Sequence, residues 1–247
     1  MNLLKMKAQH ILTYCISIAI LLLLHVSASA QNDSIPKPVS DSLVVKQKYG
    51  LRIAGDIGKL ARSFLDEDYT GFEVAADFRI KQNLYIAGEL GFEEKNTITD
   101  YLDVSTTGSY LKAGIDYNMY DNWLDMDNMV FAGFRVGASS FSHDRNSFNI
   151  YSTNQYWTPQ LSVDELEEFN GLTAFWTELI LGMKVELFNN LYMGLNVQLK
   201  LLVSETQPNN FENLYVPGYG RTYDSTSIGA GYSYTLGYRI PLYKKAK

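Results

Sequence analysis

The sequence predicts an all-β protein, an eight-stranded antiparallel up-and-down transmembrane β-barrel that follows a cleaved signal peptide. Three observations support this prediction. The chain begins with a short basic and then apolar segment, as secreted precursors do. Beyond it, apolar and polar residues alternate with a period of two in eight segments. The connections between these segments alternate between short and long, as they do in outer-membrane barrels.

The first element is the signal peptide, residues 1–30. Two lysines precede the apolar run 11–26, which ends in small residues. Ala28 and Ala30 are the small residues expected before a signal peptidase site, so we expect cleavage before Gln31. An uncleaved membrane anchor is the alternative, but the run is shorter than the roughly 18 to 20 apolar residues that a spanning helix needs.

Cleavage changes what the mature chain can do. The formal net charge falls from -6 to -8, because two lysines and no acidic residue are removed, and this argues against a nucleic-acid partner. Cys15 lies inside the apolar run, so the mature chain has no cysteine for a lipid anchor, a disulfide or thiol chemistry. His143 is its only histidine. We expect no metal, no cofactor and no catalytic site.

Three regions follow the signal peptide. Residues 31–47 are polar, contain two prolines and predict a flexible periplasmic lead-in. Residues 48–243 predict one outer-membrane β-barrel, since all-β barrels commonly reach this size as a single domain. Residues 244–247 form a basic tail.

The barrel strands are predicted from segments long enough to cross a bilayer at a tilt. Each places apolar side chains on one face and glycine, polar or charged side chains on the other. In order, the segments are 51–57, 72–80, 84–93, 111–119, 130–139, 178–187, 191–201 and 232–242.

The connections predict the orientation of the barrel. Short turns at 81–83, 120–128 and 188–190 alternate with long loops at 59–70, 94–109, 143–171 and 205–226. Short turns are typical of the periplasmic side and long loops of the external side. With an even number of strands, both termini are therefore predicted to lie in the periplasm.

Alternation alone does not decide which face points outward, because a soluble lipocalin-like barrel has the same period with its apolar face inside. An eight-stranded barrel is only just wide enough for its interior to be filled by side chains. The apolar face carries too many large residues for that space, so we expect it to face lipid.

The opposite face predicts a structural charge network in the lumen. Basic and acidic residues are nearly balanced there, and buried charges are tolerated when they are paired. The members are Arg52, Asp56, Glu73, Asp77, Arg79, Glu89, Lys112, Asp116, Arg135, Glu178, Lys184, Glu186, Lys200 and Arg239.

The last segment resembles the β-signal by which outer-membrane barrels are recognised for assembly. The matching residues are Thr235, Gly237, Ile240 and Leu242. The usual terminal aromatic is displaced, since Tyr243 is followed by the basic tail. The resemblance implies the barrel-assembly machinery as a partner during biogenesis.

A wider resemblance covers residues 172–243 and extends more faintly back to Tyr49. The motifs that carry it are Trp176 to Gly182, Asn190 to Gly194 and Tyr215 to Gly220. These motifs resemble an uncharacterised outer-membrane β-barrel family of anaerobic Gram-negative bacteria, a domain of unknown function. The resemblance implies a small barrel of unassigned role and supplies no catalytic residues.

Three features outside the strands could carry chemistry. Ser142, His143 and Asp144 are adjacent, but neighbours on a strand face opposite ways, so we expect a solvated loop histidine and not a catalytic group. A capping-box pattern from Ser162 to Glu165 predicts a short acidic helix, and its spacing does not match a calcium loop. The tyrosine-rich segment 209–223 is expected to pack over the barrel mouth.

The function predicted from these features is a structural or interaction scaffold in the bacterial outer membrane that presents external loops. Its partners would be outer-membrane lipid and an unidentified extracellular ligand or protein. A small-solute channel is the first alternative, disfavoured by the low strand number and the paired charges. A lipid-modifying enzyme is the second, disfavoured by the lack of an acid–base group.

Overall fold

The computed structural model describes residues 46–99, 101–121, 127–149, 162–163, 166–209, 212–223 and 225–246. Val44–Lys247 forms one compact unit. The predicted signal peptide, with its cleavage site at Ala28, Ala30 and Gln31, lies outside the described residues.

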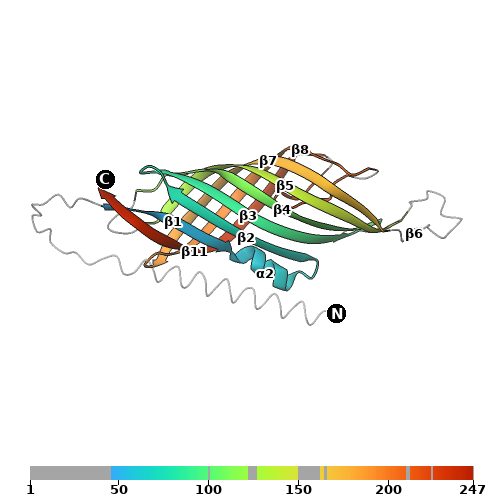
Figure 1. Cartoon of the computed structure of the whole chain (residues 1–247), viewed down its shortest axis with the longest axis horizontal. Helices are drawn as coiled ribbons and strands as arrows, with labels where there is room; N and C mark the ends of the chain where they lie inside the picture. Colours follow the sequence, from blue (N-terminus) through green and yellow to red (C-terminus); the bar gives the residue numbers. More distant parts are fainter. Residues whose placement is uncertain are drawn as a thin grey trace, which may run out of the picture. The chain divides into compact units, whose positions relative to one another are not determined.

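The described residues form a closed barrel of eight long antiparallel strands, as predicted (Figure 1). The strands are β1 (Lys46–Asp56), β2 (Tyr69–Arg79), β3 (Leu84–Ile98), β4 (Leu102–Asn118), β5 (Met129–Asn149), β7 (Glu167–Phe188), β8 (Leu191–Glu205) and β11 (Ile228–Ala246). Each strand pairs with the next along the chain, and β1 pairs with β11 to close the ring. Closure of the ring pairs most of the backbone groups of the wall between strands, which is what a strand-built membrane span requires.

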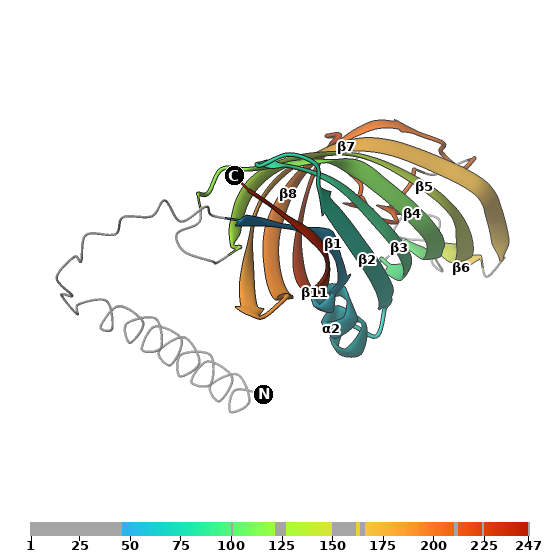
Figure 2. The same ribbon diagram turned by 60° about the vertical axis from the view of Figure 1, so that its left-hand side comes forward.

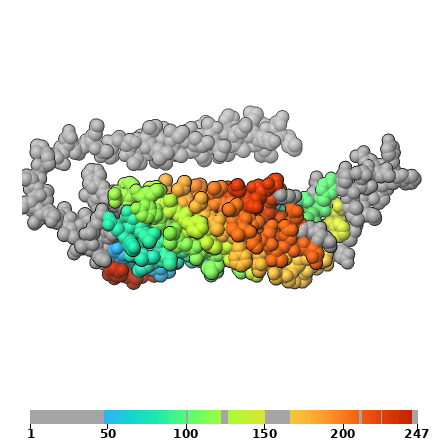
Figure 3. Space-filling view, turned by 90° about the horizontal axis from the view of Figure 1, so that it is seen from above, coloured from blue at the N-terminus to red at the C-terminus, as the bar shows by residue number. Residues whose placement is uncertain are grey.

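The outer face of the barrel is apolar and the inner face is polar. Along β3, for example, Ile86 and Leu90 are more than half exposed, whereas Glu89 between them is buried. The same alternation holds on the other strands, and Figure 3 shows the side chains of neighbouring strands forming a continuous wall. The predicted orientation, apolar side outward, is therefore confirmed, and the inside-out soluble alternative is excluded.

β1 pairs with β11 over the whole length of β1. Lys46 lies opposite Ala246, so both strands extend into the predicted lead-in and basic tail. Beside this pairing, the Tyr49 and Tyr243 rings stack with centroids 5.0 Å apart. The seam where the two chain ends meet is thus closed by backbone hydrogen bonds and by an aromatic contact.

One end of the barrel, the turn end, carries the short connections 80–83, 119–128 and 189–190. These match the predicted short turns. Asn190 has a φ of 66°, a left-handed conformation that asparagine adopts more readily than most residues. The opposite end, the loop end, carries the other four connections.

At the loop end, most of the predicted loops are wrong in extent, because the strands continue. β3 and β4 are joined by a hairpin at 99–101, and not by a loop at 94–109. β5 reaches Asn149 and β7 starts at Glu167, so both invade the predicted loop 143–171. Pairing between the strands satisfies the backbone hydrogen-bonding groups of these polar segments. The segments lack the alternation of apolar and polar residues from which a strand is predicted, so they were assigned to loops.

The short helix predicted after Ser162 is also wrong. Ser162–Val163 forms a strand, β6, that pairs with the end of β5. The residues from Glu167 onward already belong to β7. A capping box stabilises a helix only when the following turn is free to form, and here cross-strand pairing with β5 takes those backbone groups.

A helix does occur at the loop end, in a place where a strand and a loop were predicted. α2 (Ile57–Leu65) follows β1 directly, and the Asp56 carboxylate caps it by accepting from the backbone N–H of Gly58 at 2.8 Å and of Lys59 at 3.1 Å. None of the described helices is long and apolar enough to span a membrane.

Candidate functional site: a charged lumen closed by an inward-folded loop

The fourteen charged residues predicted to form a network all point into the lumen. Twelve of them are buried, while Lys184 and Glu186 are half-buried. Thirteen take part in ion pairs. Asp56 has a different part, since its carboxylate caps α2.

The middle of the lumen is held by pairs that cross between strands. Asp77 accepts from Arg52 and from Lys184, both at 2.7 Å. On the other side, Asp116 lies 2.7 Å from the Arg135 guanidinium and 3.5 Å from the Lys184 ammonium. Each charge therefore meets at least one opposite charge, which offsets the large desolvation cost of burial.

The turn end is closed by a second group of charges centred on Asp127. Its carboxylate pairs with Arg239 and lies 3.6 Å from Arg79, and it accepts from the Tyr192 hydroxyl at 3.2 Å. Glu186 lies 3.5 Å from Arg239. The sequence interpretation missed Asp127, because it falls in a predicted turn and not on a strand face.

A third group lies toward the loop end, where Lys59 of α2 reaches into the lumen. Its ammonium lies 2.5 Å from Glu93 and 3.0 Å from Glu73. The Tyr110 hydroxyl donates to Glu73 at 2.5 Å. Lys112 pairs with Glu89 and lies 3.4 Å from Glu73, so this group is continuous with the middle of the lumen.

The loop between β8 and β11 folds back into the mouth of the barrel. Its tip is a hairpin of β9 (Tyr215–Val216) and β10 (Gly220–Arg221), and residues 215–219 are buried. We call residues 212–223 the plug loop. The sequence had predicted a tyrosine-rich segment over the mouth, and the structure places its tip inside the mouth.

Buried charges hold the plug loop. Glu93 accepts from the Tyr215 hydroxyl at 2.7 Å and from the Gly218 backbone N–H at 2.9 Å. Lys200 donates to the carbonyl oxygens of Gly218 at 2.7 Å and Tyr219 at 3.1 Å. Burial, together with the nearby Glu93 carboxylate, raises the pKa of Tyr215 well above its usual value, so Tyr215 remains a donor.

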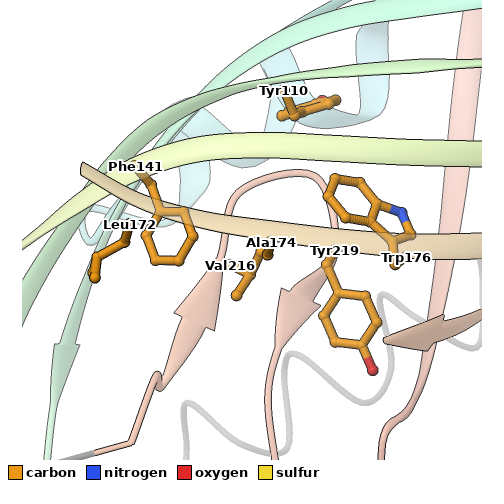
Figure 4. Close-up of a cluster of buried hydrophobic side chains, with 7 residues drawn as sticks. All are labelled: Tyr110, Phe141, Leu172, Ala174, Trp176, Val216 and Tyr219. Carbon is orange, nitrogen blue, oxygen red and sulfur yellow. The ribbon is translucent and has the colours of Figure 1, made fainter. Parts of the chain in front are cut away.

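An apolar cluster seats the loop against the wall (Figure 4). Its members are Tyr110, Phe141, Leu172, Ala174, Trp176, Val216 and Tyr219. The Tyr219 ring meets the edge of Trp176 with centroids 6.2 Å apart, and Trp176 donates through its indole N–H to Glu178 at 2.7 Å. Gly218, with a φ of 81°, lets the loop turn directly beside the Tyr110 ring.

His143 belongs to this loop contact, and the prediction of a solvated loop histidine is wrong. It lies on β5 with its side chain fully buried in the lumen. Its ring nitrogens bond to Thr106 at 2.8 Å and to Asn213 of the plug loop at 2.9 Å. Ser142 and Asp144 lie on the other face of the strand, as strand alternation requires.

This arrangement has the chemistry of a plug. The cavity in the middle of the lumen measures about 40 Å³, room for little more than water. The part of the chain that the structure describes contains no group of three or more His, Cys, Asp or Glu placed to hold a metal ion. His143 bonds to the hydroxyl of Thr106 on β4 and to the amide of Asn213 in the plug loop, so its ring joins the barrel wall to the loop.

The four residues of the predicted β-signal lie on β11 with the expected alternation. Thr235 and Gly237 face the lumen, whereas Ile240 and Leu242 are exposed on the outer face. A Cβ at Gly237 would lie 2.6 Å from the Cβ of Ala54 on β1. Glycine at this position is therefore also required for close packing of the two end strands.

Comparisons with known proteins give a family and no role. A model of the family described as a domain of unknown function (DUF6048) matches residues 11–245. Among solved structures, the attachment invasion locus protein Ail of Yersinia pestis is 9% identical with a TM-score of 0.41, over 78% of this chain and 98% of its own. Neisserial surface protein A (NspA) is 9% identical with a TM-score of 0.39, over 78% and 96%. No curated protein matches the chain significantly.

Proposed function

The chain belongs to the DUF6048 family, and we propose that it is an outer-membrane β-barrel that acts as an interaction scaffold at the cell surface. In this proposal the barrel wall anchors the protein in lipid, and the lumen is a structural plug. Recognition of an extracellular ligand or protein takes place at the loop end. The signal peptide and the β-signal on β11 would deliver the chain to the outer membrane and its assembly machinery.

The observation that carries the proposal is the closure of the lumen from both directions. Paired charges fill its middle, and the plug loop fills its mouth. The interior of an eight-stranded barrel filled in this way offers little room for a channel, so we infer that recognition of a partner takes place at the loop end.

The loop end offers such a surface. β5 and β7 have 21 and 22 residues, about twice the length that a tilted strand needs to cross a bilayer. Their polar ends extend beyond the apolar belt and carry pairs such as Arg145 with Glu167. We infer that this raised strand pair is the part of the scaffold that meets a partner.

The proposed orientation is tested with single cysteines in a Cys15→Ser background. Glu168→Cys, at the loop end, should react with a membrane-impermeant maleimide on intact cells. The matched control Gln82→Cys, in the β2–β3 turn, should react only after the outer membrane is opened. Labelling of Gln82→Cys alone on intact cells would reverse the orientation, and labelling of neither on opened cells would argue against this topology.

The channel alternative is tested by conductance in planar bilayers. The plugged lumen should give no stable ion current, and a large steady conductance from the wild-type protein would overturn the scaffold proposal in favour of a channel. The enzyme alternative predicts that overexpression changes the composition of lipid A, and we expect no change.

A further inference from the structure

The barrel wall is incomplete in one place near the loop end, because β1 ends at Asp56 while both of its neighbours, β2 and β11, continue further toward the loop end. Its ladder with β2 ends at Gly55 and Val74, and its ladder with β11 ends at Asp56 and Thr235. Beyond these points β2 continues to Tyr69 paired only with β3, and β11 continues back to Ile228 paired only with β8. We call the space between these two strand ends the lateral gap.

The lateral gap lies within the apolar belt and not above it. Phe72 of β2 and Ile228 and Tyr232 of β11 point outward beside it and are at least half exposed. Ile228 and Tyr232 lie opposite the outward-facing Leu201 and Val197 of β8. An open sheet edge in contact with lipid would leave backbone groups unsatisfied, so something must cover the lateral gap.

α2 covers it. The helix leaves the end of β1 and packs against both β2 and β11 (Figure 2). The Gly71 backbone N–H, on the free edge of β2, donates to the Ser63 hydroxyl at 2.8 Å. Gly58 packs beside the Tyr234 ring, which lies 3.3 Å from the position of an added Cβ. The helix thus takes the place of the missing part of β1.

The two faces of α2 differ sharply in chemistry. Lys59 and Ser63 point toward the barrel and bond to it. The opposite face is apolar at helical spacing and exposed; it consists of Ile57, Leu60, Ala61, Phe64 and Leu65. Phe64 and Leu65 are 89% and 86% exposed, more than any of the outward-facing side chains of the strand wall.

A cavity of about 170 Å³ lies between α2 and the barrel at the lateral gap, lined by Gly58, Lys59 and Arg62 of the helix together with strand and plug-loop residues. Ala230 and Tyr232, which line it, face outward on β11, whereas Gln198 and Lys200 on β8, which also line it, face the lumen. Its lining carries both signs of charge, with Lys59, Arg62, Lys112 and Lys200 beside Glu73 and Glu93.

From these observations we propose that the lateral gap is a binding site for an outer-leaflet lipid with a zwitterionic phosphate headgroup. The headgroup occupies the cavity between the two signs of charge, and the acyl chain passes over Tyr232 onto the apolar face of α2. This face continues the lipid-facing surface of β2 and β11, as an interfacial amphipathic helix does. The inference rests on the proposed membrane location of the barrel.

The first experiment locates α2 relative to lipid. Single cysteines at Phe64, at Leu199 in the apolar belt and at Thr99 in the β3–β4 hairpin carry a fluorophore, in proteoliposomes of phosphatidylcholine that contain a nitroxide-labelled acyl chain. We expect quenching at position 64 to match that at position 199 and to exceed that at position 99. If the fluorophore is quenched at position 199 but not at position 64, the proposed lipid site is wrong and the membrane location stands. If it is not quenched at position 199, the membrane location itself is wrong.

The second experiment measures occupancy of the cavity with fluorescent lysophosphatidylethanolamine and the full-length protein in detergent. Gly231→Phe fills the cavity, because an added Cβ lies 2.8 Å from Gln198 and 3.0 Å from Lys200. The control Gly88→Phe places the same ring on the outer face of β3, where an added Cβ meets only a carbonyl oxygen at 3.6 Å. We expect Gly231→Phe to weaken binding by about tenfold or more and Gly88→Phe to leave it unchanged.

Heat-modifiable gel migration establishes that each variant is folded. If Gly231→Phe does not fold, Arg62→Leu serves instead, since it removes a partly exposed cation from the cavity edge and leaves β11 intact. We expect this variant also to weaken binding. Equal affinity of the wild type and a folded cavity variant, or no saturable binding to the wild type, would overturn the proposal.

Discussion

Glu93 gives the most direct test of how the plug loop is held. Its carboxylate accepts two hydrogen bonds from the loop, from the Tyr215 hydroxyl and the Gly218 N–H, and it also meets Lys59 and Tyr69. Glu93→Ala removes all of these at once while leaving the β3 backbone in place. Loss of a charged acceptor from the lumen should favour states in which the loop leaves the mouth.

The magnitude follows from the number of bonds that the loop loses. A hydrogen bond to a charged group contributes about 1.5 to 3 kcal/mol, so the two loop bonds together contribute about 3 to 6 kcal/mol to the closed state. A factor of ten in population corresponds to about 1.4 kcal/mol. Glu93→Ala should therefore raise the open population at least about a hundredfold.

The assay is the reactivity of a cysteine at Val216, whose side chain is fully buried in the closed loop. In a Cys15→Ser, Val216→Cys background, the rate of reaction with a soluble maleimide reports the open population when closing is fast. Glu94→Ala is the control, because Glu94 faces outward on the same strand. If the Glu93→Ala protein is labelled at a rate within twofold of its parent, Glu93 does not hold the plug loop and the reasoning is refuted.

Three further predictions concern the lumen. Lys112→Met should lower the free energy of unfolding in urea by about 3 to 5 kcal/mol, because the buried carboxylates of Glu73, Glu89 and Glu178 lose the cation that they share. An unchanged free energy of unfolding would mean that these ion pairs do not stabilise the barrel. Gly137→Val should cost about 1 to 3 kcal/mol, since even a Cβ would lie 2.3 Å from the Trp176 ring, while Gly55→Val, with no atom within 4 Å, should be tolerated. His143→Ala should speed labelling at Val216→Cys, because the Thr106 hydroxyl and the Asn213 amide lose their hydrogen bonds to the ring, at a cost of about 1 to 3 kcal/mol. The same substitution should leave the composition of lipid A unchanged, and an altered composition would restore the enzyme hypothesis.

The parts of the site that could be predicted were those fixed by strand alternation. Arg52, Asp77 and Arg135 were assigned to the lumen because their neighbours on each strand are apolar, and a period of two then leaves only one face for them. Which carboxylate each cation meets could not be predicted. That choice depends on the stagger between strands, which brings Lys184 of β7 to Asp77 of β2 across the lumen.

The residues that were missed lie where this period is interrupted. Lys59 falls in a predicted loop, yet the helical spacing of Ile57, Leu60, Ala61, Phe64 and Leu65 after Asp56 was a readable signal for α2. His143 was taken for a loop residue because the polar end of β5 lacks the apolar alternation that marks a strand in lipid. Asp127 had no local signal, since its partners Arg79 and Arg239 come from distant strands.

The sequence by itself determined the class of barrel, the number of long strands and the face that each presents to its surroundings. These features depend on local periodicity and on the small interior volume of eight strands, and both can be evaluated along the chain. Only the tertiary structure decided that the plug loop enters the mouth and that α2 replaces the end of β1. Those features depend on contacts between residues more than a hundred positions apart, such as Glu93 with Gly218, and on how far each strand finds a partner.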